Sequence, residues 1–343
     1  YYRRSLDTGF SEMGTVSSAQ TVSFLGLTYM NRGQYDEGIK LIKEQIPLHE
    51  NNNDFMGLAN LHTNLGIVYF ESGDYQSAKD EYEKGLMLSD RLGNKQLQAI
   101  GTGCLGSVLE KQGRYEEAMD LFQQDLELCR ELGDWQGIAI AEGLVGELNR
   151  VTGKFEEAIP HLNQSLRISK DLGYQKGVAK AINALGDLYY WQEDFAKSLE
   201  YYQEAIDIAR KTDNRLVLAS SLMEKGLGLL HLDQAEELTD TVTEANKLAA
   251  ELGNPELLMS TQLLNARVAA KEGDFKVAIS ILQEQLANLD ATPEQQAAAY
   301  FERFRISHDD SEARDLARAL YEQLFLETPK YEYQVRLEQL RDE

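Results

Sequence analysis

The sequence is poor in proline, cysteine and long apolar runs, and each deficit excludes a class of protein. Five prolines among 343 residues argue against long disordered linkers. Cys104 and Cys129 provide neither a disulfide framework nor a metal cluster, and their apolar neighbours predict small core side chains. No run approaches the roughly 18 apolar residues of a membrane helix. We therefore expect an ordered protein of the reducing cytoplasm.

Positive charge is also scarce. Lysine and arginine total 34 residues against 57 aspartates and glutamates, so the net charge is −23 and the pI is about 4.7. Such a chain repels phosphate backbones and anionic membrane surfaces. We therefore expect neither nucleic acid nor a membrane as partner, whereas a basic partner is tolerated.

Catalytic patterns are missing as well. The sequence has no His-Glu-x-x-His metal motif, no phosphate-binding loop and no nucleophile elbow. Acidic pairs such as Glu116-Glu117 fall in the predicted first turn of a helix, where they favour the helix dipole. The histidines are scattered along the chain, at His49, His62, His161, His231 and His308. We expect no catalytic residues, no metal, no cofactor and therefore no enzyme.

What the sequence does contain is self-similarity at a step of 40 residues. A single core rarely grows beyond about 250–300 residues, so this chain holds either several domains or a repeat array. One register consists of Gly33, Gly73, Gly113, Gly153 and Gly273. A second consists of Gly26, Gly66, Gly106, Gly146, Gly186 and Gly226. A third consists of Gly38, Ala78, Ala118, Ala158, Ser198 and Ala278, and a fourth of Asn53, Gly93, Gly133, Gly173, Asp213 and Gly253.

Each register has a physical reason. A glycine inside a helix costs about 1 kcal/mol relative to alanine, so the Gly66 register predicts positions where another helix comes very close. The Ala78 register supplies the matching small residue on a second helix. The Gly73 and Gly93 registers predict helix ends in the left-handed conformation. Two helices per repeat follow from this pattern.

Local patterns agree with paired helices. Apolar residues in 114–132 recur every three or four positions, as on one face of a helix. Asn94, Asp134 and Asn254 follow the turns and are predicted N-caps. No alternating strand pattern of useful length occurs. The expected fold class is therefore all-α: an α-solenoid superhelix of about seven to eight antiparallel helix pairs.

The residues that carry these registers resemble the tetratricopeptide repeat: Leu-Gly in the first helix, then Tyr or Phe after the turn glycine, and Ala three positions further on. The 40-residue period, longer than the common 34-residue form, resembles repeats of Pins/LGN-type polarity scaffolds and of bacterial signalling proteins. Two departures are clear. The usual first-helix aromatic is replaced by Val22, His62, Thr102 and Glu142, and the usual terminal proline by Glu50, Asp90, Arg130 and Lys170.

The registers also divide the chain. Residues 16–290 form seven 40-residue repeats. Tyr1-Tyr2 matches Tyr201-Tyr202 five periods later, so residues 1–15 are either the remnant of a preceding repeat or an N-terminal cap. Residues 291–343 form a degenerate repeat and a C-terminal capping helix, with helix starts predicted at Thr292-Pro293 and Asp310-Ser311 and a stop at Pro329.

The resemblance implies a partner-binding groove lined by the first helices. Counting from each Leu-Gly pair, the residues expected to face it are Asn31, Asn60, Thr63, Asn64, Glu71, Ser107, Glu110, Lys111, Glu147, Arg150, Lys180, Asn183, Asp187, Tyr190, Trp191, Glu224, His231, Arg267 and Lys271. The Lys/Asn/Arg clamp that some relatives use for a C-terminal carboxylate is not reproduced, because Leu27 stands where the clamp needs asparagine.

Several of these residues have two interpretations. The amides of Asn60, Asn64 and Asn183 either pair with the backbone of an extended peptide or belong to a solvated face. Tyr190 and Trp191 either anchor a partner or pack against the next repeat. The charges of Arg150 and Lys180 either meet an acidic group or form local ion pairs with Glu147 and Asp187.

The function implied by the resemblance is protein–protein interaction, with a peptide or protein segment held in the groove of a scaffold. The alternative is a ligand- or peptide-sensing regulatory arm of a larger signalling protein that carries an ATPase, kinase, cyclase or transcription regulator. The oligomeric state stays open.

Overall fold

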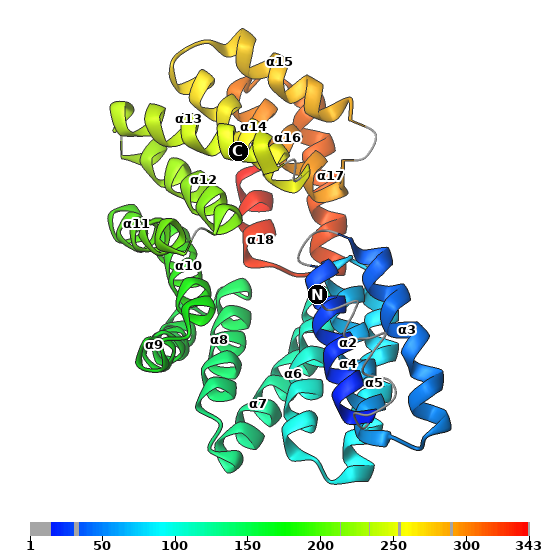
Figure 1. The fold of residues 1–343 in the computed structure, drawn as a ribbon. Coiled ribbons are helices and arrows are strands. Elements are labelled where there is room, and N and C mark those ends of the chain that lie inside the picture. Colours follow the sequence, from blue (N-terminus) through cyan, green and yellow to red (C-terminus); the bar gives the residue numbers. More distant parts are fainter. Residues whose placement is uncertain are drawn as a thin grey trace. The chain divides into compact units, whose positions relative to one another are not determined.

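The computed structural model describes residues 15–30, 34–212, 214–232, 234–252, 255–288 and 291–341, with only the backbone of residues 15–18 and 255–256. Within these ranges the chain is built of helices and contains no strand (Figure 1). The predicted all-α solenoid is thereby confirmed. Apart from Thr15, the predicted remnant at residues 1–15 lies outside the described residues.

The helices alternate as predicted between first and second members of a pair. The first members are α2 (Thr15–Met30), α4 (Phe55–Glu71), α6 (Lys95–Lys111), α8 (Trp135–Val151), α10 (Gln175–Trp191), α12 (Arg215–His231) and α14 (Pro255–Lys271). The second members are α3 (Tyr35–Asn51), α5 (Tyr75–Leu92), α7 (Tyr115–Leu132), α9 (Phe155–Leu172), α11 (Phe195–Lys211), α13 (Ala235–Leu252) and α15 (Phe275–Leu286). From Phe55 to Pro255 the first members begin at intervals of 40 residues.

Beyond residue 290 a further pair, α16 (Pro293–Ile306) and α17 (Ser311–Glu327), is followed by the short helix α18 (Tyr331–Gln339). These starts match the predicted ones. Thr292 and Gln295 form a capping box at α16, and the Asp310 side chain accepts the Ala313 N–H at α17. The degenerate end of the chain is therefore helical and ordered around its own caps.

The turns between helices use the predicted left-handed residues. Gly93, after α5, has φ 62°, and Asn53 and Glu193 adopt the same region with φ 53° and 61°. The predicted N-caps Asn94 and Asp134 accept the N–H groups of Leu97 and Gly137 at 3.1 and 2.9 Å. Other members of these registers lie outside the described residues, namely Gly33, Asp213, Asp233, Gly253 and Asn254.

The helical glycines are needed because large side chains of the second helix lie over them. A Cβ on Gly66 would come within 2.6 Å of the Tyr82 ring, and one on Gly106 within 2.6 Å of the Phe122 ring. The other glycines of this register are covered in the same way, by Ile42, Leu162 and Tyr202, and in the weaker sixth repeat by Leu264. The close approach is thus made by a bulky residue one turn after the small one, while Ala78 and its equivalents are fully buried beside it.

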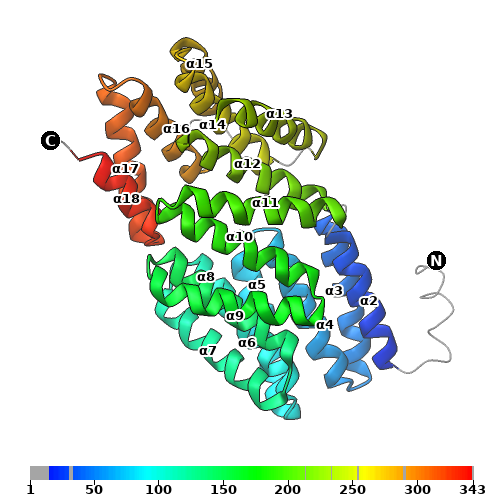
Figure 2. The same ribbon diagram turned by 90° about the vertical axis from the view of Figure 1, so that its left-hand side faces the viewer.

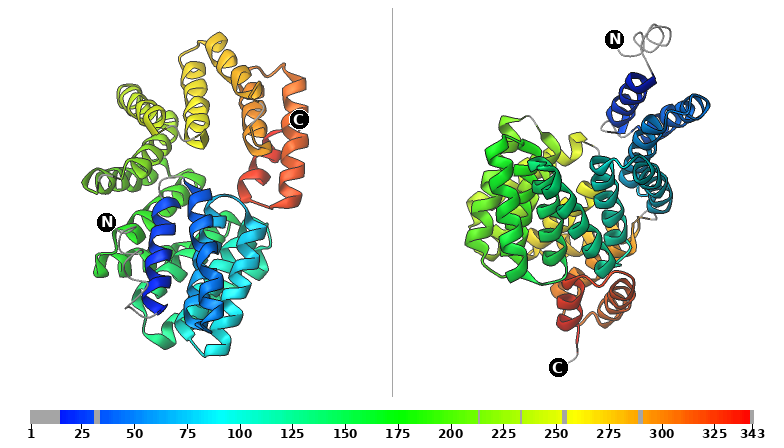
Figure 3. Two further views of the ribbon diagram at one scale, coloured as in Figure 1. Left: turned by 45° about the vertical axis from the view of Figure 1, so that its right-hand side comes forward. Right: turned by 90° about the horizontal axis from the view of Figure 1, so that it is seen from below.

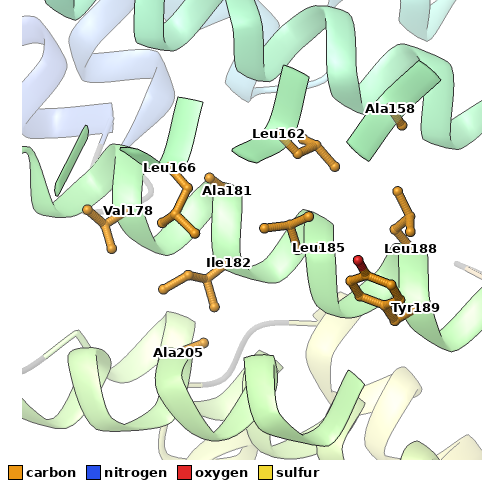
Figure 4. Close-up of a cluster of buried hydrophobic side chains, with 10 residues drawn as sticks. All are labelled: Ala158, Leu162, Leu166, Val178, Ala181, Ile182, Leu185, Leu188, Tyr189 and Ala205. Carbon is orange, nitrogen blue, oxygen red and sulfur yellow. The ribbon is translucent and has the colours of Figure 1, made fainter. Parts of the chain in front are cut away.

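The chain divides into two compact units, residues 1–145 and 146–343, at a point within α8. In unit 1, α2, α4 and α6 contact one another in sequence, and Figure 3 shows these blue and cyan helices side by side. In unit 2, one core cluster joins α9, α10 and α11 through residues such as Leu162, Ile182 and Ala205 (Figures 2 and 4). Each pair therefore buries its apolar stripe against its neighbours, as expected for stacked repeats.

Candidate functional site

Unit 2 contains a cavity of about 500 Å³, which lies in the range of roughly 300–1,000 Å³ typical of ligand sites. Its walls come from the C-terminal halves of α10, α12 and α14, from α16, from the starts of α11 and α15, and from α18. The lining residues are Tyr190, Trp191, Glu193, Phe195, Leu227, Leu230, His231, Arg267, Ala270, Lys271, Phe275, Glu302, Arg305, Ile306, Tyr331, Val335, Arg336 and Gln339.

One side of the cavity is aromatic. The Tyr190 ring makes edge contacts with Trp191, Phe195 and His231 at centroid distances of 5.8, 5.5 and 5.7 Å. His231 in turn stacks on Phe195 at 4.0 Å. Because these rings come from α10, α11 and α12, they join two consecutive repeats into a rigid apolar wall.

The opposite side is cationic. The Arg267 guanidinium donates to Glu302 at 2.8 Å, and Arg305 contacts the same carboxylate at 3.3 Å. Arg336 lies over the rings of Phe301 and Trp191, 4.6 and 5.6 Å from their centroids. One buried carboxylate therefore faces three guanidinium groups, which leaves an excess of positive charge.

The pKa values of neighbouring groups reflect this excess. Burial alone would raise the pKa of Glu302, but Arg267, Arg305 and Arg336 together hold it below its usual value. The pKa of His231 is lowered by its burial and then by Arg267, Arg305 and Lys271. The imidazole is therefore neutral at pH 7, and the Glu302 carboxyl is ionised.

An acidic cluster lies on the same helices, about one turn before the cavity. Glu147 accepts two hydrogen bonds from Arg150, at 2.6 and 2.9 Å, and Arg150 reaches Asp187 at 3.9 Å. Asp187 also accepts the Tyr202 hydroxyl at 2.8 Å. Among the described residues Glu224 makes no ion pair or hydrogen bond, and burial, followed by Asp187 and Glu332, raises its pKa to about 8.

This pKa predicts a pH-dependent stability. A carboxyl whose pKa is raised on folding binds more protons in the folded state, so stability falls as pH rises from about 4.3 in the unfolded chain through about 8. Glu224→Gln should therefore raise the melting temperature at pH 8.5, by the equivalent of at least about 1 kcal/mol. At pH 5 it should change little, because the native carboxyl is already protonated there.

The measurement is thermal unfolding of both proteins between pH 5 and 9. Glu200→Gln, an exposed carboxylate on α11, is the control and should leave the pH profile unchanged. A parallel pH profile for the Glu224→Gln and unsubstituted proteins would show that the Glu224 carboxyl is ionised and solvated.

Helix α18 forms one wall of the cavity and lies beside α17 (Figures 1 and 2). Tyr331 packs on the turn at Gly153, where an added Cβ would come within 2.6 Å of its ring. The same ring makes edge contacts with Phe155 at 5.1 Å and Trp191 at 6.3 Å. α18 therefore packs against the first helices of unit 2, on the side where the cavity opens.

Comparison with known proteins follows from this geometry. Models of the tetratricopeptide repeat match residues 17–89, 97–171 and 178–212, more than half of the chain. The chain belongs to the tetratricopeptide repeat family. A search of the curated proteins finds no match.

Several solved structures share the fold of this tetratricopeptide repeat protein. The apo quorum sensor NprR from B. thuringiensis superposes with a TM-score of 0.69 at 14% identity, covering 94% of this chain and 92% of that one. NprR in complex with its cognate peptide NprX gives 0.63 at 13% identity, with the same coverage. A Rap protein in complex with competence and sporulation factor gives 0.64 at 14% identity, covering 95% and 100%. At these identities the likeness shows the fold.

The structure brings together many of the residues predicted from the repeat register. Those that line the cavity are Tyr190, Trp191, His231, Arg267 and Lys271. Those in the neighbouring acidic cluster are Glu147, Arg150, Asp187 and Glu224. The Asn183 side chain accepts the Ser221 hydroxyl at 3.3 Å, and Lys180 is exposed.

The two interpretations of these side chains are partly combined. Arg150 forms the local ion pair with Glu147. Tyr190 packs against the next repeat through His231 and also lines the cavity. Packing and exposure to a ligand are therefore compatible for this residue.

The residues predicted in unit 1 lie apart from the cavity. Thr63 is buried, where its hydroxyl would meet a Cβ on Gly85, so it is not available to a partner. The Asn60 and Asn64 amides donate to carbonyls one turn earlier in α4, at 2.9 and 2.7 Å. The Ser107 hydroxyl also bonds within its helix. Glu71 and Lys111 are exposed and Glu110 is partly buried, while Asn31 lies outside the described residues.

Sequence reasoning missed the half of the cavity that follows the last regular repeat. Glu302, Arg305, Tyr331 and Arg336 belong to α16 and α18, where the 40-residue register no longer applies. The pairing of a basic side chain with an aromatic one a turn apart, as in Tyr331 and Arg336, was the available indication.

Within the described part of the chain, no group of three or more His, Cys, Asp or Glu side chains has an arrangement suited to a metal ion. No helix there is long and apolar enough to cross a membrane.

Proposed function

We propose that this tetratricopeptide repeat protein is a protein–protein interaction module that binds a peptide or protein segment on the first helices of unit 2. The observation that carries this is the convergence of Tyr190, Trp191, His231, Arg267 and Lys271, from three successive repeats, on one cavity of about 500 Å³. Aromatic and arginine side chains are the types that dominate binding hot spots.

The similar structures support the proposal. NprR has been solved in complex with its cognate peptide NprX, and a Rap gene regulator in complex with the Phr* peptide. The proposal assigns no catalytic step and no cofactor to the chain. Its strongly acidic charge of −23 argues against nucleic acid as the partner, and we propose a cytoplasmic location. No described feature favours the sensing-arm alternative over the simpler module.

The test is selection of linear peptides from a display library against the intact chain, followed by titration of the enriched peptides. Asn183→Ala combined with Trp191→Ala should weaken their binding at least about tenfold, because a buried aromatic anchor contributes about 2 kcal/mol or more. Circular dichroism should show an unchanged helical content.

The matched control is Trp135→Ala combined with Asn163→Ala, which removes the same residue types at exposed positions away from the cavity. This control should bind as the unsubstituted protein does. If selection enriches no peptide, or if both double variants bind equally well, the peptide site is not in this cavity.

A further inference from the structure

The cavity in unit 2 has a charge opposite to that of the chain around it. Its lining holds four cationic side chains, Arg267, Lys271, Arg305 and Arg336, against two carboxylates, Glu193 and Glu302. The whole chain carries a net charge of −23. A local excess of positive charge in such a background is maintained against the composition, and it points to an anionic ligand.

The arginines have more donors than the protein accepts. The Arg267 Nε is buried without a hydrogen-bond partner among the described residues. The Arg336 guanidinium has one carboxylate within reach in the described chain, Glu332 of its own helix, at 3.9 Å. That separation exceeds the roughly 2.7–2.9 Å of a charge-assisted hydrogen bond. An oxyanion from outside would complete this coordination.

Arg336 is held ready for such a contact. Its guanidinium lies over the Phe301 ring at 4.6 Å and the Trp191 ring at 5.6 Å, and its side chain is 13% exposed. Stacking on two rings fixes the guanidinium plane without using its donors. A planar carboxylate is the group that matches two parallel N–H donors of such a fork.

The remaining surface of the cavity is apolar. The rings of Tyr190, Trp191, Phe195, Phe275 and Tyr331 and the aliphatic side chains of Leu227, Leu230, Ile306 and Val335 surround the charges. A small hydrated anion would leave this surface wet. An anion attached to an aliphatic or aromatic body would cover it and gain free energy from burial.

Resting on the proposed function and deepening it, we propose that the cavity binds a carboxylate attached to an apolar body, with Arg336 meeting the carboxylate and the Tyr190–Trp191 wall receiving the apolar part. Such chemistry is found in the C-terminal residue of a peptide with an apolar side chain and in free aliphatic or aromatic carboxylic acids. The helices concerned, α10 to α18, differ from those of the clamp that Leu27 rules out.

The chain provides its own reporter for the test. It has two tryptophans, Trp135 and Trp191, and Trp135 is 58% exposed in unit 1. In a Trp135→Phe background the tryptophan fluorescence comes from the cavity alone. The small-molecule arm titrates this protein with octanoate and 3-phenylpropionate and with the corresponding amides. The peptide arm uses Gly-Ser-Gly-Ser-Leu-Phe with a free and with an amidated C-terminus.

The expected result is a saturable fluorescence change with the carboxylates, at least tenfold weaker with the amides. Tighter binding of the free-ended peptide than of 3-phenylpropionate identifies a peptide terminus as the ligand, and the reverse order identifies a free acid. Arg336→Gln should weaken carboxylate binding at least tenfold. Arg305→Gln, on a half-exposed side chain, should also weaken it and serves if Arg336→Gln does not fold. Arg210→Gln, a surface arginine of α11, should have no effect.

Three results would overturn the proposal: equal affinity for acids and amides, carboxylate binding that survives both arginine substitutions, or tighter binding of phenyl phosphate than of 3-phenylpropionate. The outcome is separable from that of the proposed function. Display-selected peptides whose binding depends on Trp191 but not on a carboxylate would keep the interaction site and remove this ligand chemistry. Carboxylate binding without any selected peptide would do the opposite.

Discussion

Gly106→Leu should lower the free energy of unfolding by more than about 3 kcal/mol, a loss at the upper end of the range for overpacked cores. A Cβ at this position would lie 2.6 and 2.8 Å from two atoms of the Phe122 ring and 3.3 Å from the Leu121 Cβ. Phe122 is fully buried, so its ring has no free space to move into. The better helix propensity of leucine, worth about 1 kcal/mol over glycine, does not offset this clash.

The same helix contains a matched control. A Cβ on Gly101 would meet only Leu86, at 3.5 Å, an ordinary van der Waals distance. Gly101→Ala should therefore be neutral or stabilise by up to about 1 kcal/mol, whereas Gly106→Ala should destabilise. Urea and thermal unfolding followed by circular dichroism measure all three variants. Similar stabilities for Gly101→Ala and Gly106→Ala would mean that α6 and α7 do not approach each other as the structure shows.

The success of the repeat register explains how much of the fold was predictable. Gly106 and its equivalents are local statements about steric space, and each one fixes a contact within a single helix pair. Because the contact recurs every 40 residues, seven weak indications reinforce one another. The identity of the covering residue was not predictable in this way, since Ile42, Tyr82, Phe122, Leu162 and Tyr202 share only bulk and position.

The candidate site was predictable only where the register runs. Counting along the repeats found Trp191, Arg267 and Lys271, which line the cavity. It also placed Thr63 on the groove, although its hydroxyl bonds the Ala59 carbonyl of its own helix and faces Gly85. A side chain one position away on a helix points about 100° elsewhere, so a register alone does not separate the inner face from the pair interface.

The other half of the site depends on tertiary contacts that no repeat encodes. Arg336 reaches Trp191, 145 positions earlier in the sequence, because α18 packs against the first helices of unit 2. The placement of α18 follows from Tyr331 on Gly153 and Tyr333 on Glu294. Such long-range pairs require the coordinates, since each residue alone has an ordinary surface composition.

Glu302→Gln should lower the free energy of unfolding by about 3–5 kcal/mol, the usual cost of removing one partner from a buried ion pair. Glu302 is 2% exposed, and it accepts Arg267 at 2.8 Å and Arg305 at 3.3 Å. Glutamine fills the same space but carries no charge, so the guanidinium groups lose the one carboxylate that they share.

The pH dependence distinguishes this cause from simple misfit. The pKa of Glu302 is lowered in the folded protein, so its contribution is present above the unfolded value of about 4.3 and is lost as pH falls through the folded value. The stability difference between Glu302→Gln and the unsubstituted protein should therefore be constant from pH 5 to 7 and shrink below pH 4. Glu204→Gln, which removes the exposed partner of Lys170, should cost no more than about 1 kcal/mol. A cost for Glu302→Gln as small as that for Glu204→Gln would mean that water already screens the three arginines, and the cavity would then lack the desolvated positive charge on which carboxylate binding depends.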